Sequence, residues 1–133
     1  MNVGELRGAT PALVAKLKAQ EIGTDEALLN AAKTPAARKE LAKALGVEPG
    51  AVLELANRAD LARIVGIGQV FSDLLENAGV DTVKELANRV PENLLAKMTE
   101  VNAAKKLAGR LPTVDQVKDW VAQAKKLPKL LEY

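Results

Sequence analysis

The chain has 133 residues, of which 48% are hydrophobic and 27% charged, a balance typical of one ordinary globular domain and not of a disordered chain. Cysteine and histidine are absent and aromatic residues make up only 2%, which excludes disulfides, thiol nucleophiles, imidazole bases and the stacking platforms of single-strand binders. The net charge of +2 is too small to indicate a nucleic-acid binder by itself.

The first half of the chain predicts a series of helices. Residues 24–33 and 34–45 form two of them, and Gly46 is expected to end the second. Another helix follows from Pro49 to about Arg58. Residues 57–61 then form a connection without proline or glycine, so the two halves are expected to pack together. No segment alternates with period two, and we expect no strands.

Residues 61–89 are the most informative stretch of the chain. They predict a short helix, the tight turn Gly66-Ile67-Gly68, a second helix, and a third helix after Gly79. Glycine suits such a turn because it adopts dihedrals that side chains resist. The backbone N–H groups left unpaired at the positive end of the second helix dipole would be those of Gly68, Gln69 and Val70. This arrangement binds anions, but it equally serves a plain corner between two helices, and both interpretations stay open.

Residues 1–60 repeat this organisation at the offset of 58 positions that separates Gly8 from Gly66. The matching pairs are Leu6 with Ile64, Gly8 with Gly66, Leu17 with Leu75, Ile22 with Val80, Thr24 with Thr82, and Leu28 with Leu86. They indicate a duplicated hairpin whose two copies cover each other's apolar faces. Thr10 replaces the second turn glycine, and Glu21 replaces Gly79. We therefore expect the first copy to keep the fold with a degenerate anion site, its left-handed stop lost or moved to Gly23.

The remaining segment predicts three helices. Pro91 opens the first, a break near Val101-Asn102 precedes a second over residues 103–111, and Pro112 stops it. Thr113 and Gln116 have capping-box spacing at the start of the last helix, which ends at Pro128 and carries Trp120 as an expected packing residue.

The stretches RADLARIVGIG, DLLENAGVDTVKELANR and LPTVDQVKDWVAQAKKL resemble a bacterial family of tandem helix-hairpin-helix proteins known as a domain of unknown function. The likeness covers nearly the whole chain and is strongest from about Asn57 onward. It implies an all-α, compact multi-helix domain built from two tandem units: a degenerate one over 1–60 and a second over 61–133 that includes the C-terminal helices. By wider analogy it implies sequence-independent contact with the DNA backbone and a monovalent cation on the turn carbonyls, and it implies no reaction.

The candidate nucleic-acid-binding residues are Arg63, Gly66, Ile67, Gly68, Gln69, Val70, Lys84, Lys105, Lys106 and Arg110. The basic residues concentrate near the C-terminus: residues 103–130 hold seven Lys and Arg against two Asp, or +5, which leaves 2 − 5 = −3 for the rest. A solvated face explains this concentration equally well. Against the assignment, Val70 stands where DNA-binding hairpins commonly carry a basic residue, and Asp73 follows one turn later.

Two functions remain open on the sequence. The first is a nonenzymatic module that contacts duplex DNA backbone through the Gly66-Ile67-Gly68 turn, and the alternative is a helical interaction or scaffold domain with a protein partner. No nucleophile or carboxylate has a base beside it, so we expect no enzyme, no cofactor, no metal and no small-molecule substrate. The start MNVGELRG lacks an apolar leader and no apolar run could cross a membrane, so we expect a cytoplasmic protein with no membrane partner.

Overall fold

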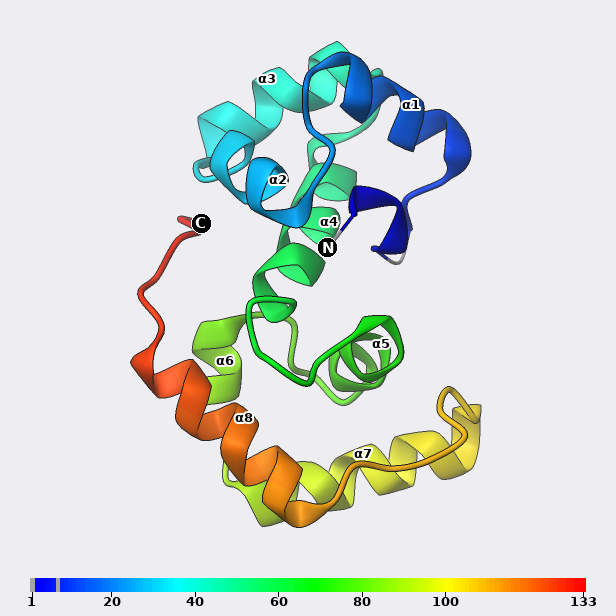
Figure 1. Ribbon diagram of the computed structural model, residues 1–133, viewed down its shortest axis with the longest axis vertical. Helices are drawn as coiled ribbons and strands as arrows, with labels where there is room; N and C mark the ends of the chain where they lie inside the picture. Colours follow the sequence, from blue (N-terminus) through cyan, green and yellow to red (C-terminus); the bar gives the residue numbers. More distant parts are fainter. Residues whose placement is uncertain (1, 7) are drawn as a thin grey trace. The chain divides into compact units, whose positions relative to one another are not determined.

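The computed structural model describes residues 2–6 and 8–133, and this part of the chain is all-α, with no strand and one isolated bridge between Asn2 and Thr24 (Figure 1). Its elements are the 3₁₀ turn η1 (Val3–Glu5) and the helices α1 (Pro11–Ala19), α2 (Asp25–Ala31), α3 (Pro35–Leu45), α4 (Pro49–Leu61), α5 (Gln69–Asn77), α6 (Val83–Ala87), α7 (Pro91–Lys105) and α8 (Val114–Lys126). No helix among them combines the length and the apolar character that a membrane span requires.

The contacts divide the chain into two compact units. The first unit comprises residues 1–60 together with the C-terminal segment Lys129–Tyr133, and the second comprises Leu61–Pro128. Each unit has its own apolar core. The segment 129–133 thus belongs with the first unit, although it follows α8 in the chain.

In the first unit, threonine caps open the first three helices. The hydroxyls of Thr10, Thr24 and Thr34 accept hydrogen bonds from backbone N–H groups three residues on. Gly46 ends α3 in the left-handed conformation, with φ of 70°. α1 packs on η1 and α3, and α2 packs on α3. The buried apolar side chains of α4 complete this core.

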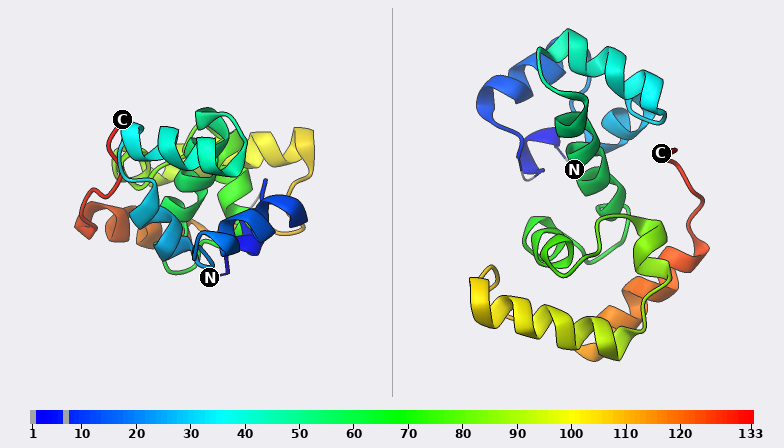
Figure 2. Two further views of the ribbon diagram at one scale, coloured as in Figure 1. Left: turned by 90° about the horizontal axis from the view of Figure 1, so that it is seen from above. Right: turned by 180° about the vertical axis from the view of Figure 1, so that it is seen from behind.

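In the second unit, α8 packs against α6 and α7, and α5 packs against α7 (Figures 1 and 2). Thr113 and Gln116 form the predicted capping box of α8. Thr82 caps α6 on the N–H of Glu85, but the Glu85 carboxylate pairs with Arg89 instead of returning to the cap. Trp120 is buried in the core, which confirms the packing role expected for it.

Four predictions about the positions of helices are wrong. α4 continues through the expected connection at 57–61, and the expected short helix after Leu61 is a turn. The expected break near Val101-Asn102 lies within α7, which continues to Lys105, and residues 106–111 form no helix. The Asn102 side chain explains this last error, because it bonds both backbone groups of Ala108 and so fastens the loop that follows the helix.

Two pairs of helices match in length between the two units. α1 and α5 have nine residues each at the offset of 58, while α4 and α8 have thirteen each at an offset of 65, from Pro49 to Val114. At this second offset the buried side chains also correspond: Val52 with Val117, Leu55 with Trp120, Ala56 with Val121, and Ala59 with Ala124. The two offsets differ because the segments between these helices differ in length.

Candidate functional site

The turn 66–68 joins the end of α4 to the start of α5 through two successive tight turns. The N–H of Ile64 bonds to the carbonyl of Leu61, and the N–H of Ile67 bonds to the carbonyl of Ile64. The Ile64 and Ile67 side chains are buried in the second core, while Gly66 and Gly68 are exposed. The buried side chains of Ile64 and Ile67 therefore fix the turn, and its two glycines lie at the surface.

Gly66 and Gly68 differ in whether the backbone requires glycine. Gly66 has φ of +102°, in the region that favours glycine, and a Cβ there would lie 2.9 Å from Nε1 of the buried Trp120. Gly68 has φ of −98° and ψ of −165°, an extended conformation open to any residue, and a Cβ there would meet nothing within 4 Å. Only Gly66 is required by the backbone, which corrects the expectation that both glycines are.

Gln123 of α8 holds the turn from outside. Its Oε1 accepts the Val65 N–H at 2.9 Å and its Nε2 donates to the Val65 carbonyl at 3.0 Å. The same Nε2 donates to Asp119 Oδ2 at 2.8 Å. Because both backbone groups of Val65 bind one amide, and because Trp120 lies against Gly66, α8 fixes the position of the turn.

The N-terminus of α5 carries no side-chain cap. Its N-cap residue is Gly68, and the first helical bond runs from the Ser72 N–H to the Gly68 carbonyl. The N–H groups of Gln69 and Val70 precede this bond, and both residues are exposed. The equivalent position in α1 is closed, because the Thr10 hydroxyl accepts the Leu13 N–H and Pro11 has no N–H.

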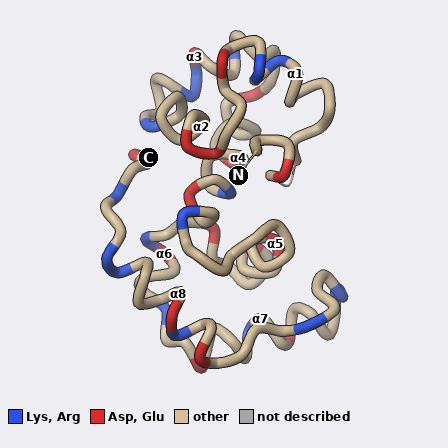
Figure 3. The backbone as a smooth tube through the Cα atoms, in the orientation of Figure 1, with Lys and Arg blue, Asp and Glu red and all other residues tan. Residues whose placement is uncertain are grey.

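The predicted basic residues do not gather at the turn. The Arg63 guanidinium donates to the Pro128 carbonyl at 2.8 Å, just beyond α8. Lys105 bonds to Asn77 at the C-terminal end of α5, the opposite end of that helix from Gly68. Lys106 and Arg110 are exposed in the loop after α7, and Lys84 is exposed on α6. In Figure 3 the blue Lys and Arg positions are spread over several elements of the tube.

Asp73 and Val70, the two residues that argue against phosphate binding, differ in their exposure to solvent. Asp73, expected on a polar face near a phosphate path, is buried, with only 8% of its surface exposed. Val70 is exposed as expected, at 46%, and Val65 is exposed at 79%. The turn therefore presents valines and backbone amides to solvent, and no carboxylate from Asp73.

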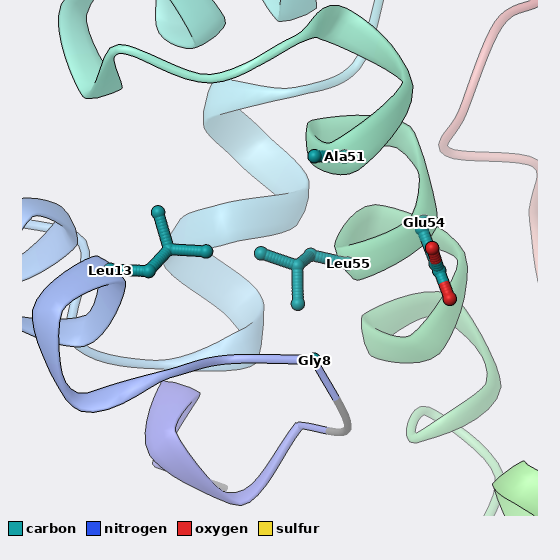
Figure 4. Close-up of a pocket in the computed structure, with 5 residues that line it drawn as sticks. All are labelled: Gly8, Leu13, Ala51, Glu54 and Leu55. Carbon is teal, nitrogen blue, oxygen red and sulfur yellow. The ribbon is translucent and has the colours of Figure 1, made fainter.

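The first unit has a small cavity of about 70 Å³ at the position equivalent to the Trp120 contact. Its lining residues are Gly8, Leu13, Ala51, Glu54 and Leu55. Figure 4 shows the Leu13 and Leu55 side chains facing each other across it, with the Glu54 carboxylate turned away. The cavity is too small for a drug-sized ligand and is a packing feature.

Comparison with known families identifies one match. A family model described as a domain of unknown function, DUF4332, matches residues 7–127. The chain belongs to this family. No curated protein and no solved structure matches the chain.

Sequence reasoning missed one contributor to the turn of this DUF4332 protein, the Gln123 side chain. Gln123 resembles any polar residue on an amphipathic helix, and only its distance to Val65 reveals its role. Lys126 lies three residues beyond Gln123 on α8 and so shares its helix face.

Proposed function

We propose that this DUF4332 protein is a nonenzymatic helix-hairpin-helix module that contacts the phosphate backbone of duplex nucleic acid without sequence preference. The contact is made by the turn Gly66-Ile67-Gly68 and the first N–H groups of α5. One phosphate oxygen would occupy the uncapped N-terminus, where the partial positive charge of the helix dipole favours an anion.

The observation that carries this proposal is the difference between the two equivalent helix starts. The start of α1 is closed by a threonine hydroxyl and a proline, whereas that of α5 has a glycine cap and two exposed residues with free space around Gly68. Relative to a glycine N-cap, a capping side chain adds roughly a few tenths of a kcal/mol of stability, so the glycine at the start of α5 costs the fold little. α7 also begins without a side-chain cap, but its first residue is Pro91, which has no N–H, whereas α5 begins with the exposed Gln69 and Val70, which both carry one.

The charges around the turn support weak, salt-dependent binding. Arg63 lies before the turn, and Lys126 shares the α8 face of Gln123, which contacts Val65. Asp119 on the same face is an opposing charge. With so few cations, we expect dissociation constants on the order of 10⁻⁴ to 10⁻⁶ M at physiological salt and a steep loss of affinity as salt rises.

The test compares wild type with Gly68→Thr by fluorescence anisotropy on labelled duplex, junction and single-stranded DNA at low and physiological salt. The extended backbone and open space at Gly68 admit threonine, whose hydroxyl would cap α5 as Thr10 caps α1. We expect duplex affinity to fall at least tenfold while thermal stability is unchanged or slightly higher. Gly68→Glu, which adds a negative charge, should abolish binding without unfolding the chain.

Gly109→Thr is the matched control, because Gly109 is exposed and a Cβ there also meets nothing within 4 Å. It should bind like the wild type. Equal binding by wild type and Gly68→Thr would reject the α5 N-terminus as the site. No DNA binding by the wild type at low salt would reject the proposed function altogether.

A protein-interaction module is the second candidate, and one observation favours it. Val65 and Val70 expose 79% and 46% of their surfaces on either side of the turn. Exposed apolar side chains beside a rigid turn are a common feature of protein contacts. In that case Val65→Ser would weaken self-association or partner capture, while salt would have little effect.

A further inference from the structure

The C-terminal segment 129–133 lies in extended form against the corner between α2 and α3 (Figures 1 and 2). The Glu132 N–H donates to the Lys33 carbonyl at 2.7 Å, and the Glu132 carbonyl accepts from Arg38 Nη2 at 2.6 Å. Leu131 is buried in the first core, and the Tyr133 hydroxyl donates to Asn57 Oδ1 at 2.9 Å. The segment is therefore held by backbone bonds at one residue and side-chain contacts at its two neighbours.

Arg38 is the centre of this contact. Only 5% of its surface is exposed, and its Nη1 donates to the carbonyls of Ala32 and Lys33 at 2.9 and 3.3 Å. Its guanidinium carbon lies 5.7 Å from the centre of the Tyr133 ring, within range of a cation–π interaction. Because Ala32 and Lys33 follow α2 directly, the corner itself orients Arg38, with Nη2 left to donate to an incoming carbonyl.

The corner contacts the side chains of Leu131 and Tyr133 but not the side chain of Glu132. Successive side chains of an extended peptide point to opposite sides, so Leu131 and Tyr133 can face the corner together. The Glu132 side chain is exposed, and the corner bonds only the backbone of that residue. Backbone bonds that supply affinity, combined with alternate side chains that supply specificity, are characteristic of sites for extended peptides.

We propose that the α2–α3 corner is a binding site for extended peptides in which a leucine is followed two residues later by a tyrosine. The chain's own segment 129–133 occupies this site. Because that segment is tethered, its effective concentration is high, and a peptide in solution competes poorly until the tethered segment is weakened.

The test uses a fluorescently labelled peptide, Lys-Leu-Leu-Glu-Tyr, with the full chain and with Glu132→Pro. Proline removes the N–H that bonds to Lys33 and leaves the buried Leu131 in place. We expect the labelled peptide to bind Glu132→Pro at least tenfold more tightly than the wild type. Adding Arg38→Met to Glu132→Pro should reduce that binding at least tenfold.

The peptide itself provides the matched controls. Changing its glutamate to glutamine should leave binding unchanged, whereas changing the leucine before that glutamate to serine should abolish it. Leu131→Ser in the chain is a second way to weaken the tethered segment and should also expose the site, with circular dichroism confirming that the fold persists.

The proposal is overturned if folded Glu132→Pro and folded Leu131→Ser both fail to bind the peptide. It is also overturned if the serine-substituted peptide binds as well as the original. DNA binding is measured at the α5 turn, on the second unit, so the failure of either proposal leaves the other standing.

Discussion

The two units share their backbone turns but fill the space behind them with different side chains. Gly8 and Gly66 have φ of +94° and +102°, and the threonine caps Thr24 and Thr82 have φ, ψ of −129°, 162° and −135°, 161°. Hydrogen bonds repeat as well, since Ile22 bonds to Leu17 as Val80 bonds to Leu75, both at 2.9 Å. These matches indicate that nearby residues set the conformation of the equivalent turns in both units.

The packing behind the turns is where the units diverge. In the second unit, Phe71 and Trp120 meet with ring centroids 5.3 Å apart, and Trp120 lies directly against Gly66. In the first unit the equivalent residues are Leu13 and Leu55, and a cavity of about 70 Å³ lies among them and Gly8. The comparison shows that the same turn forms over a loosely packed core at Gly8 and a tightly packed one at Gly66. The tighter packing lies behind the turn that leads into the uncapped helix α5.

The variants Gly66→Ala and Gly8→Ala test this difference in packing and are expected to have the largest effects on stability. Both place a side chain at positive φ, which costs about 1–2 kcal/mol. Only Gly66→Ala also pushes a Cβ to 2.9 Å from Trp120, whereas the nearest atom to a Cβ at Gly8 is 3.8 Å away. We expect losses of about 3 kcal/mol for Gly66→Ala and about 1–2 kcal/mol for Gly8→Ala, measured by urea unfolding.

The double variant Gly66→Ala/Trp120→Leu separates strain from contact. Leucine at position 120 copies the first unit, so adding Gly66→Ala should then cost no more than Gly8→Ala does. Equal losses for the two single variants would show that the Trp120 contact adds nothing to the requirement for glycine.

Glu21→Gly tests the second difference between the hairpins. Glu21 stands where Gly79 stands and takes the same left-handed conformation, with φ of 62°, so the stop after α1 is retained and is not moved to Gly23. Relief of strain worth about 1–2 kcal/mol, partly offset by the flexibility of glycine, should stabilise the chain by about 0.5–1 kcal/mol. Gln20→Gly, at φ of −96°, is the control and should destabilise it. If Glu21→Gly destabilises the chain, the left-handed conformation of Glu21 is not strained.

Leu13→Phe is expected to have the smallest effect. Phenylalanine copies Phe71 of the second unit and fills part of the cavity beside Leu55. Cavity filling of this kind commonly adds 0.5 kcal/mol or more, and we expect about 0.5 kcal/mol, measured by thermal unfolding. Leu13→Ala should lower stability as the control. A loss of stability in Leu13→Phe would mean that the cavity cannot accept the ring.

Much of the local structure could be predicted because it depends on near neighbours in the sequence. The threonine caps, the left-handed Gly46 and the capping box of α8 all involve residues within a few positions of one another. Predictions failed where a side chain reached outside its own turn. Asn102 resembled a helix breaker, but it bonds Ala108 from inside α7.

The candidate site divides in the same way. The position of the Gly66-Ile67-Gly68 turn and of the helix after it followed from sequence, because glycine and the apolar pattern mark them. The sequence could not show that Lys105 lies at the far end of α5 or that Asp73 is buried, because both depend on packing between helices.

The sequence by itself determined an all-α chain and the positions of most helix starts. Only the tertiary structure decided that α8 holds the turn through Trp120 and Gln123, and that the segment 129–133 docks on Arg38. The physical reason is range: caps and turns are set by bonds between nearby residues, whereas a buried ring, an amide pair or a docked segment requires partners that only folding brings together.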